Sequence, residues 1–172
     1  MNRFEVEISE KINLLREQDA AFNPADARER QLLAAEEWLV QHSRETIESI
    51  HKLQLTKYDC HIVGLIERIG SPLADICARQ LIELLLDMNW PVYQSALSAL
   101  FSLDEQAVLN AAEDLVNDEC FKDLDVFCYH VMQIRPPWMQ KVKPCLTEAM
   151  HKVLEYANNS ALSELYQELD PS

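Results

Sequence analysis

The chain has 172 residues, with 29 Asp and Glu against 15 Lys and Arg, so its formal net charge at pH 7 is −14. Apolar residues make up 48% and charged residues 26%, a balance that is typical of a globular protein and excludes an acidic disordered tail as the main state. A surface this acidic repels nucleic-acid backbones and anionic membranes, so we expect no direct nucleic-acid binding and no membrane binding. We expect a partner that is attracted by this negative charge to be basic.

Glycine and proline usage indicates helices. The chain contains only two glycines, Gly64 and Gly70, which leaves little material for tight β-hairpins or phosphate-binding loops. The seven prolines are spread along the chain, mostly where a helix could begin, so they indicate boundaries between helices. We therefore expect an all-α fold.

The first half of the chain shows four helical patterns. Apolar residues at helical spacing predict one helix over about residues 2–19 and a second over about 24–42. Ser43 is expected to cap a third helix and Asp59 a fourth, with Gly70 as the C-cap of the fourth. The buried side of the fourth helix is expected to comprise Ile62, Val63, Ile66 and Ile69.

The strongest amphipathic pattern opens at Ser71 and Pro72. Its inward stripe is expected to comprise Leu73, Ile76, Cys77, Leu81, Leu84, Leu85 and Met88. Trp90, at the following joint, is expected in the core, and Ser102 with Glu105 has the spacing of a capping box. Later helices are predicted over about 119–134, 137–143, 144–157 and 159–169.

Nine or ten helices of ordinary length with short joins favour stacked antiparallel pairs over a long parallel bundle. We therefore expect an irregular α-solenoid of HEAT or armadillo type, formed by a single all-α domain over residues 1–172. Its parts would be N-terminal helices over 1–57, HEAT-like helix pairs over 58–157 and a C-terminal helix over 158–172. An irregular orthogonal bundle is the alternative, because the pairs show little self-similarity.

Motifs for chemistry are sparse. The five cysteines are widely spaced, without a Cys-x-x-Cys pair, and so predict reduced thiols rather than a disulfide framework or a zinc site. The N-terminus lacks the layout of a signal peptide and no apolar stretch has membrane-spanning length, which predicts a cytoplasmic protein. No nucleophile-elbow, zincin or phosphate-loop motif occurs, so we expect neither an enzyme nor a bound cofactor.

Two Glu-x-x-His quartets, Glu48 to His51 and Glu148 to His151, are the enzymatic alternative. Ferritin-like proteins use such quartets on facing helices to hold two irons, and such a di-metal site must face a bundle interior. The apolar stripe of the second quartet's helix turns His151 towards water, so solvated surface residues are the favoured interpretation.

The negative charge is concentrated in one block. Residues 80–125 contain ten acids and a single base, Lys122, whereas residues 126–152 sum to +3. No Lys or Arg occurs from Gln80 to Phe121, although a solvated helical face normally alternates charges. First-turn acids account for about half of the block, because they complement the helix dipole. The expected partner-binding residues are Asp87, Asn89, Asp104, Glu105, Asp114, Asp118, Glu119, Asp123 and Asp125.

The segment from Leu84 to Val92 reads Leu-Leu-Leu-Asp-Met-Asn-Trp-Pro-Val. It resembles the signature of a bacterial family of HEAT-like helical domains of uncharacterised function, in which an Asp-Met-Asn-Trp-Pro joint links helix hairpins. The resemblance covers about residues 60–140. Members of that family are similar to immunity proteins of contact-dependent growth inhibition systems. The resemblance therefore implies that the chain binds and neutralises a toxin domain.

Charge and resemblance together favour one function. A nuclease toxin, such as an RNase, has a cationic substrate cleft that an acidic surface can mask. We therefore expect an immunity protein for a basic toxin domain. The alternative is a HEAT-like adaptor that binds another basic partner.

Overall fold

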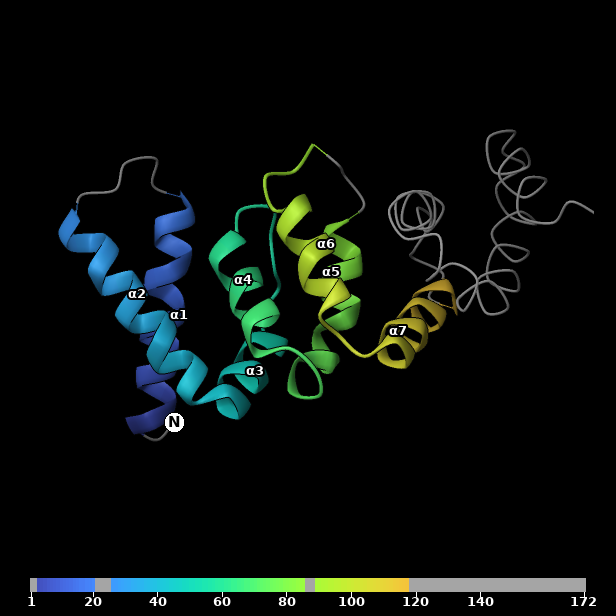
Figure 1. Cartoon of the computed structure of the whole chain (residues 1–172), viewed down its shortest axis with the longest axis horizontal. Coiled ribbons are helices and arrows are strands. Elements are labelled where there is room, and N and C mark those ends of the chain that lie inside the picture. The colour runs from blue at the N-terminus through green and yellow to red at the C-terminus, as the bar shows by residue number, and fades with distance from the viewer. Residues whose placement is uncertain (1–2, 21–25, 86–88, 118–172) are drawn as a thin grey trace, which may run out of the picture. The chain divides into compact units, whose positions relative to one another are not determined.

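A computed structural model describes residues 3–20, 26–85 and 89–117 of the chain (Figure 1). These residues form helices and contain no strand, which confirms the all-α prediction for this part of the chain. The elements are α1 (Arg3–Ala20), α2 (Asp26–Gln41), α3 (Ser43–His51), α4 (Cys60–Ile69), the 3-10 helix η1 (Leu73–Cys77), α5 (Ala78–Leu84), α6 (Tyr93–Phe101) and α7 (Glu105–Asn117). The helices expected beyond residue 118 lie outside the described residues.

The chain divides into two compact units, Met1–Val108 and Leu109–Ser172. The first unit holds α1 to α6 and the start of α7. The second unit is described only as far as Asn117, the last residue of α7.

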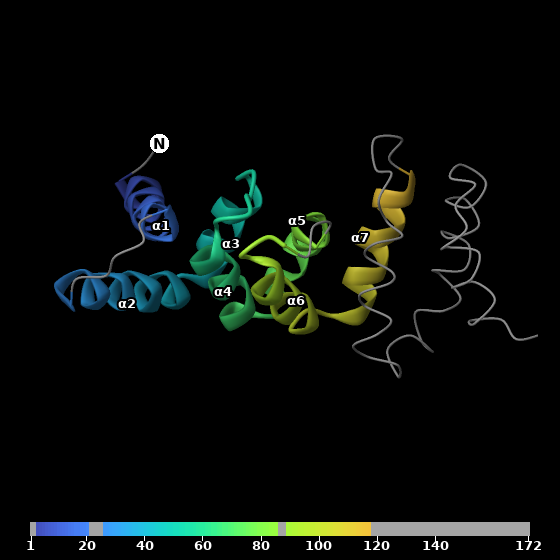
Figure 2. The ribbon, with the colours of Figure 1, turned by 90° about the horizontal axis from the view of Figure 1, so that it is seen from above.

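Consecutive helices pair within the first unit. Helix α1 packs on α2, α3 packs on α4, and η1 with α5 packs on α4 and α6. Figure 2 shows the odd-numbered helices α1, α3 and α5 in one row and α2, α4 and α6 in a second row. Neighbours within the second row also touch, so α4 contacts both α2 and α6.

Helix α4 is central because it is apolar on a broad face. Its side chains Ile62, Val63, Leu65 and Ile66 are buried, which confirms three of the four inward positions predicted for it. Ile69, the fourth, is half-buried. Gly70 ends the helix as predicted: its φ is +63°, and its N–H donates to the carbonyl of Ile66 at 2.9 Å.

The segment after Pro72 differs from the predicted single α-helix. It begins as the 3-10 helix η1 and continues as α5, and Leu73 and Ile76 are 36% and 47% exposed rather than inward. A 3-10 helix repeats every three residues, so Leu73 and Ile76 share one side while Ala74 and Cys77 share another, which is buried. The α-helical period therefore fails only over η1. The other described members of the predicted stripe are buried as predicted: Cys77, Leu81, Leu84 and Leu85. Met88 lies outside the described residues.

The predicted helix starts are correct to within a few residues, but neither Ser43 nor Asp59 makes the predicted side-chain cap. Ser43 is the first residue of α3, and its hydroxyl donates to the carbonyl of Val40 instead of capping α3. Asp59 stands at the N-cap position of α4 without a capping hydrogen bond, because its carboxylate is bound by Arg16 and Thr56. Trp90, expected in the core, is only half-buried.

Candidate partner-binding surface

Asp104, one of the predicted partner-binding acids, caps α7. Its Oδ1 accepts hydrogen bonds from the backbone N–H groups of Gln106 at 3.0 Å and Ala107 at 3.2 Å. These are the second and third residues of the helix, whose N–H groups have no partner within it. The cap is therefore Asp104 rather than Ser102, whose hydroxyl donates to the carbonyl of Ala99. The carboxylate of Asp104 is exposed and can still act on a partner through its charge.

Asp104 is also tied to η1. Its backbone N–H donates to Oδ1 of Asp75 at 3.0 Å, and Oδ2 of Asp75 accepts from the hydroxyl of Ser71 at 2.9 Å. Asp75 therefore joins the start of η1 to the start of α7. This carboxylate has a structural task that the charge count does not reveal.

Of the other predicted partner-binding residues, the structure describes only Asn89, Glu105 and Asp114. Glu105 is half-buried and Asp114 is exposed; they lie nine residues apart on α7, which places them about 180° apart around the helix. Asn89 is exposed on the segment before α6. The remaining predicted residues, Asp87, Asp118, Glu119, Asp123 and Asp125, lie outside the described residues.

The first Glu-x-x-His quartet lies on α3, where Glu48 and His51 are both exposed. Among the residues that the structure describes, no three His, Cys, Asp or Glu side chains come together as a possible metal site. The second quartet, Glu148 to His151, lies outside those residues.

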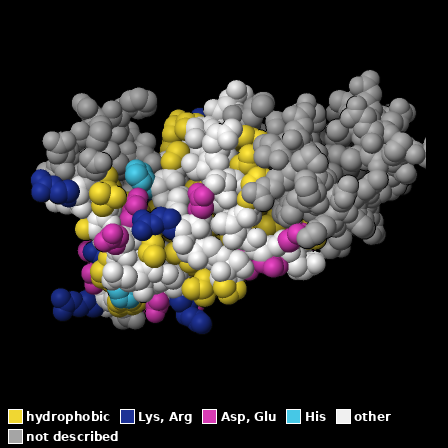
Figure 3. Space-filling model, in the orientation of Figure 1, with side chains coloured by type: hydrophobic (Ala, Val, Ile, Leu, Met, Phe, Trp, Pro, Cys, Tyr) yellow, Lys and Arg dark blue, Asp and Glu magenta, His cyan; other side chains and the backbone are white. Residues whose placement is uncertain are grey.

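The outer face of α4 forms a polar surface that the sequence analysis missed. Its members recur at the helical period on the side opposite the buried residues: Cys60, His61, Gly64, Glu67 and Arg68. Together with Glu36 of α2 they line an open cavity of about 550 Å³. Figure 3 looks onto this face, where acidic, basic and His side chains lie close together over α2 and α4.

An ion-pair network joins α2 to α4 at this cavity. Glu36 is 16% exposed; its Oε1 lies 3.0 Å from Nδ1 of His61, and its Oε2 lies 3.1 Å from a guanidinium nitrogen of Arg68. His61 and Arg68 are seven residues, or about two helical turns, apart on α4. The single carboxylate of Glu36 therefore bridges two turns of this helix. The network fixes the wall of the cavity on the α2 side.

On its other side, α4 is joined to α6 by a hydrogen bond. The hydroxyl of Ser98 donates to Oε1 of Glu67 at 2.6 Å. Glu67 is exposed and makes no ion pair with any residue of the described ranges. The cavity thus has α4 as its floor and Glu36 of α2 on one side, while Glu67 of the floor is bound by Ser98 of the neighbouring helix α6.

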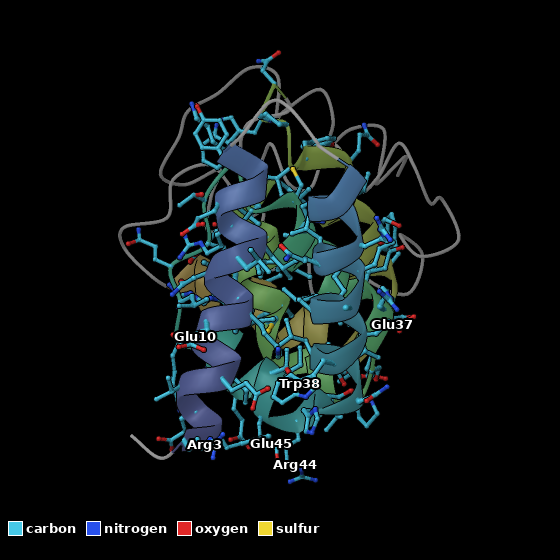
Figure 4. The ribbon with its side chains drawn as sticks, turned by 90° about the vertical axis from the view of Figure 1, so that its left-hand side faces the viewer. Arg3, Glu10, Glu37, Trp38, Arg44 and Glu45 are labelled. Atoms are coloured by element: carbon cyan, nitrogen blue, oxygen red, sulfur yellow. The ribbon has the colours of Figure 1, made fainter. Side chains whose placement is uncertain are left out.

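A second surface cluster surrounds Trp38, between α1 and α2 (Figure 4). The ring of His42 stacks on the indole with centroids 4.0 Å apart, Phe4 lies 5.6 Å away, and Nζ of Lys11 lies 4.9 Å from the indole centroid. Arg3, Arg44 and Glu45 lie towards one end of this cluster in Figure 4. Trp38 is half-buried, and its cation site is occupied by the chain's own Lys11.

The two described cysteines differ in environment. Cys77 is buried, and burial raises the pKa of its thiol to about 12, so the thiolate does not form near neutral pH. Cys60 is half-buried at the cavity beside Gly64. The structure describes no disulfide between them.

Compared with known protein families, curated proteins and solved structures, the chain shows no significant match to any of them. None of the helices in the described ranges combines the length and apolar character needed to cross a bilayer.

Proposed function

We propose that this chain is an immunity protein that binds a basic toxin domain, such as a nuclease, and neutralises it by masking its active site. The fold proposed with this function is an irregular α-solenoid of HEAT-like helix pairs. Three successive pairs, from α1 with α2 to η1 and α5 with α6, support that arrangement. Helix pairs stacked in this way offer long surfaces for protein partners.

The observation that carries the proposal is the charge of α7. This helix of 13 residues contains three acids, Glu105, Glu113 and Asp114, and no base. On a solvent-exposed helix, acidic and basic side chains three or four residues apart attract each other and stabilise the helix. Helix α7 carries acids alone and therefore lacks this stabilisation. A basic partner supplies the missing positive charges. The same bias extends along the sequence, which has no Lys or Arg from Gln80 to Phe121.

The acids would act mainly on the rate of association. Opposite net charges attract over about 8 Å at physiological salt, and electrostatic steering can raise association rates by orders of magnitude. Affinity after contact would come from a few buried side chains at the interface. The chain would need no catalytic residue, because occupying the toxin's cleft is sufficient.

Co-expression tests the proposal directly. The open reading frame next to the gene for this chain is expressed in bacteria with and without the chain, and growth is measured. We expect growth arrest without the chain and rescue with it. A neighbouring product that is not toxic, or a toxin that the chain does not neutralise, would reject the immunity function and leave the adaptor for a basic partner as the better hypothesis.

At Asp104, a substitution can remove the negative charge while keeping the helix cap. Asn caps helices about as well as Asp, so Asp104→Asn should keep the stability of the chain while removing one charge. Combined with Asp114→Asn, it should slow association with the toxin several-fold at low salt and less at high salt. Glu48→Gln, an exposed acid on α3 outside the acidic block, is the matched control. Equal rates for all variants would count against the acidic block as the contact region.

A further inference from the structure

Gly64 lies in the middle of α4, where the fold does not require glycine. Of the two glycines, only Gly70 has a φ in the left-handed region, so the backbone at Gly64 does not require glycine. A Cβ built at Gly64 would meet no described atom within 4 Å. Glycine inside a helix is unfavourable relative to Ala, so this residue lowers the stability of α4 without a packing reason among the described residues.

Glycine at a helix surface permits close approach of another backbone. Gly64 is the central residue of the outer α4 face, with Cys60 and His61 one turn before it and Glu67 and Arg68 one turn after it. It therefore lies on the floor of the cavity beside Glu36 of α2, and Glu67, one turn further along α4, is bound by Ser98 of α6. A bare backbone flanked by fixed polar side chains lets a second helix pack across α4, and we call the open cavity along this face the groove.

The charged side chains at the groove favour a basic partner segment. The titratable groups there are the carboxylates of Glu36 and Glu67, the guanidinium of Arg68 and the imidazole of His61. Arg68 and His61 are already held by Glu36, whereas Glu67 has no ion-pair partner in the described ranges. A Lys or Arg on the incoming segment would pair with Glu67, and the net charge of −14 favours the approach of a basic segment.

We propose that a basic helix of a partner protein packs across α4 at Gly64, with a Lys or Arg of that helix bound to Glu67. The proposal rests on the proposed function only in taking the partner to be basic. It places the contact on α4, outside the acidic block of residues 80–125.

The two glycines make the test simple. The full chain labelled with ¹⁵N only at glycine gives two backbone signals, Gly64 in the groove and Gly70 in the turn after α4. The probe is an amphipathic helical peptide rich in Lys and Leu, and its Glu-for-Lys analogue is the control. We expect the Gly64 signal to shift saturably with the Lys peptide alone, while Gly70 stays in place. An unmoved Gly64 signal, or equal shifts with both peptides, would overturn the proposal.

Variants give a second readout. Gly64→Leu fills open space, so it should fold as shown by circular dichroism yet weaken binding of the Lys peptide roughly tenfold or more. Ala34→Leu adds the same side chain at an exposed position of α2 that does not line the cavity, and should bind normally. Equal binding by the two variants would contradict the proposal.

Toxin rescue separates the two proposals. If the wild-type chain rescues growth and Gly64→Leu rescues equally well, the groove is not the contact and the immunity function stands. If the wild-type chain fails to rescue but the Lys peptide shifts Gly64, the immunity function is rejected and the groove is supported.

Discussion

Arg16 and Asp59 form a bidentate ion pair between guanidinium and carboxylate, although they lie 43 residues apart in the sequence. Nε of Arg16 lies 2.6 Å from Oδ1 of Asp59, and a terminal nitrogen lies 3.1 Å from Oδ2. The Asp59 side chain is only 3% exposed, and its Oδ2 also accepts from the backbone N–H of Thr56 at 2.6 Å. The pair joins α1 to the start of α4, and thereby positions the helix that forms the groove floor.

Removing the charge of Asp59 should destabilise the fold. Asp59→Asn keeps an acceptor but breaks the ion pair and turns an N–H group towards Arg16, so we expect a loss of about 2 kcal/mol in the free energy of unfolding. Glu83→Gln is the matched control, because Glu83 and its partner Arg79 are each 45% exposed. That change should cost about 0.5 kcal/mol or less. Urea unfolding followed by circular dichroism measures both, and equal losses would refute the structural importance of the buried pair.

The cap of α7 makes a second prediction. Asp104→Ala removes the acceptor of two backbone N–H groups and should cost about 1 kcal/mol. Ser102→Ala removes only a hydrogen bond to the carbonyl of Ala99 and should cost about 0.5 kcal/mol. Thermal unfolding of the two variants therefore distinguishes the observed cap from the capping box that the sequence predicts. A larger loss for Ser102→Ala would favour the capping box.

Alanine at the two glycines should have opposite effects. Gly64→Ala should raise the free energy of unfolding by about 0.5–1 kcal/mol, because Ala favours a helix interior and the site has room for its Cβ. Gly70→Ala should lower it by about 1–3 kcal/mol, because φ +63° with ψ −173° is a conformation that only Gly adopts readily. Denaturant midpoints of the two variants provide the test. Changes of the same sign would contradict the roles given to these residues.

The buried thiol of Cys77 should resist alkylation in the folded protein. Its pKa is raised to about 12 by burial, so very little thiolate is present at pH 8 to 9. Iodoacetamide treatment followed by peptide mass spectrometry should show Cys77 modified only after urea is added. Because the folded pKa exceeds the unfolded value, this group leaves stability unchanged below about pH 9 and lowers it as the pH rises towards 12. Rapid native labelling of Cys77 would contradict its burial.

Local patterns predicted much of the helical structure. The apolar period of residues 60–69 correctly indicated that Ile62, Val63 and Ile66 face inward, and Gly70 correctly marked the end of α4. The same rule was wrong for Leu73 and Ile76, because a 3-10 turn changes which residues share a side. Periodicity is informative only when the helix type is known.

The sequence by itself determined the helical class of the described residues, the inward face of α4 and the one-sided charge of α7. These depend on composition and on residues a few positions apart. Only the tertiary structure decided what individual carboxylates do: Asp59 binds Arg16, Asp75 binds the backbone N–H of Asp104, and Glu36 joins His61 to Arg68. The reason is physical, since a carboxylate is assigned by the donors that reach it. Those donors come from helices that only folding brings together.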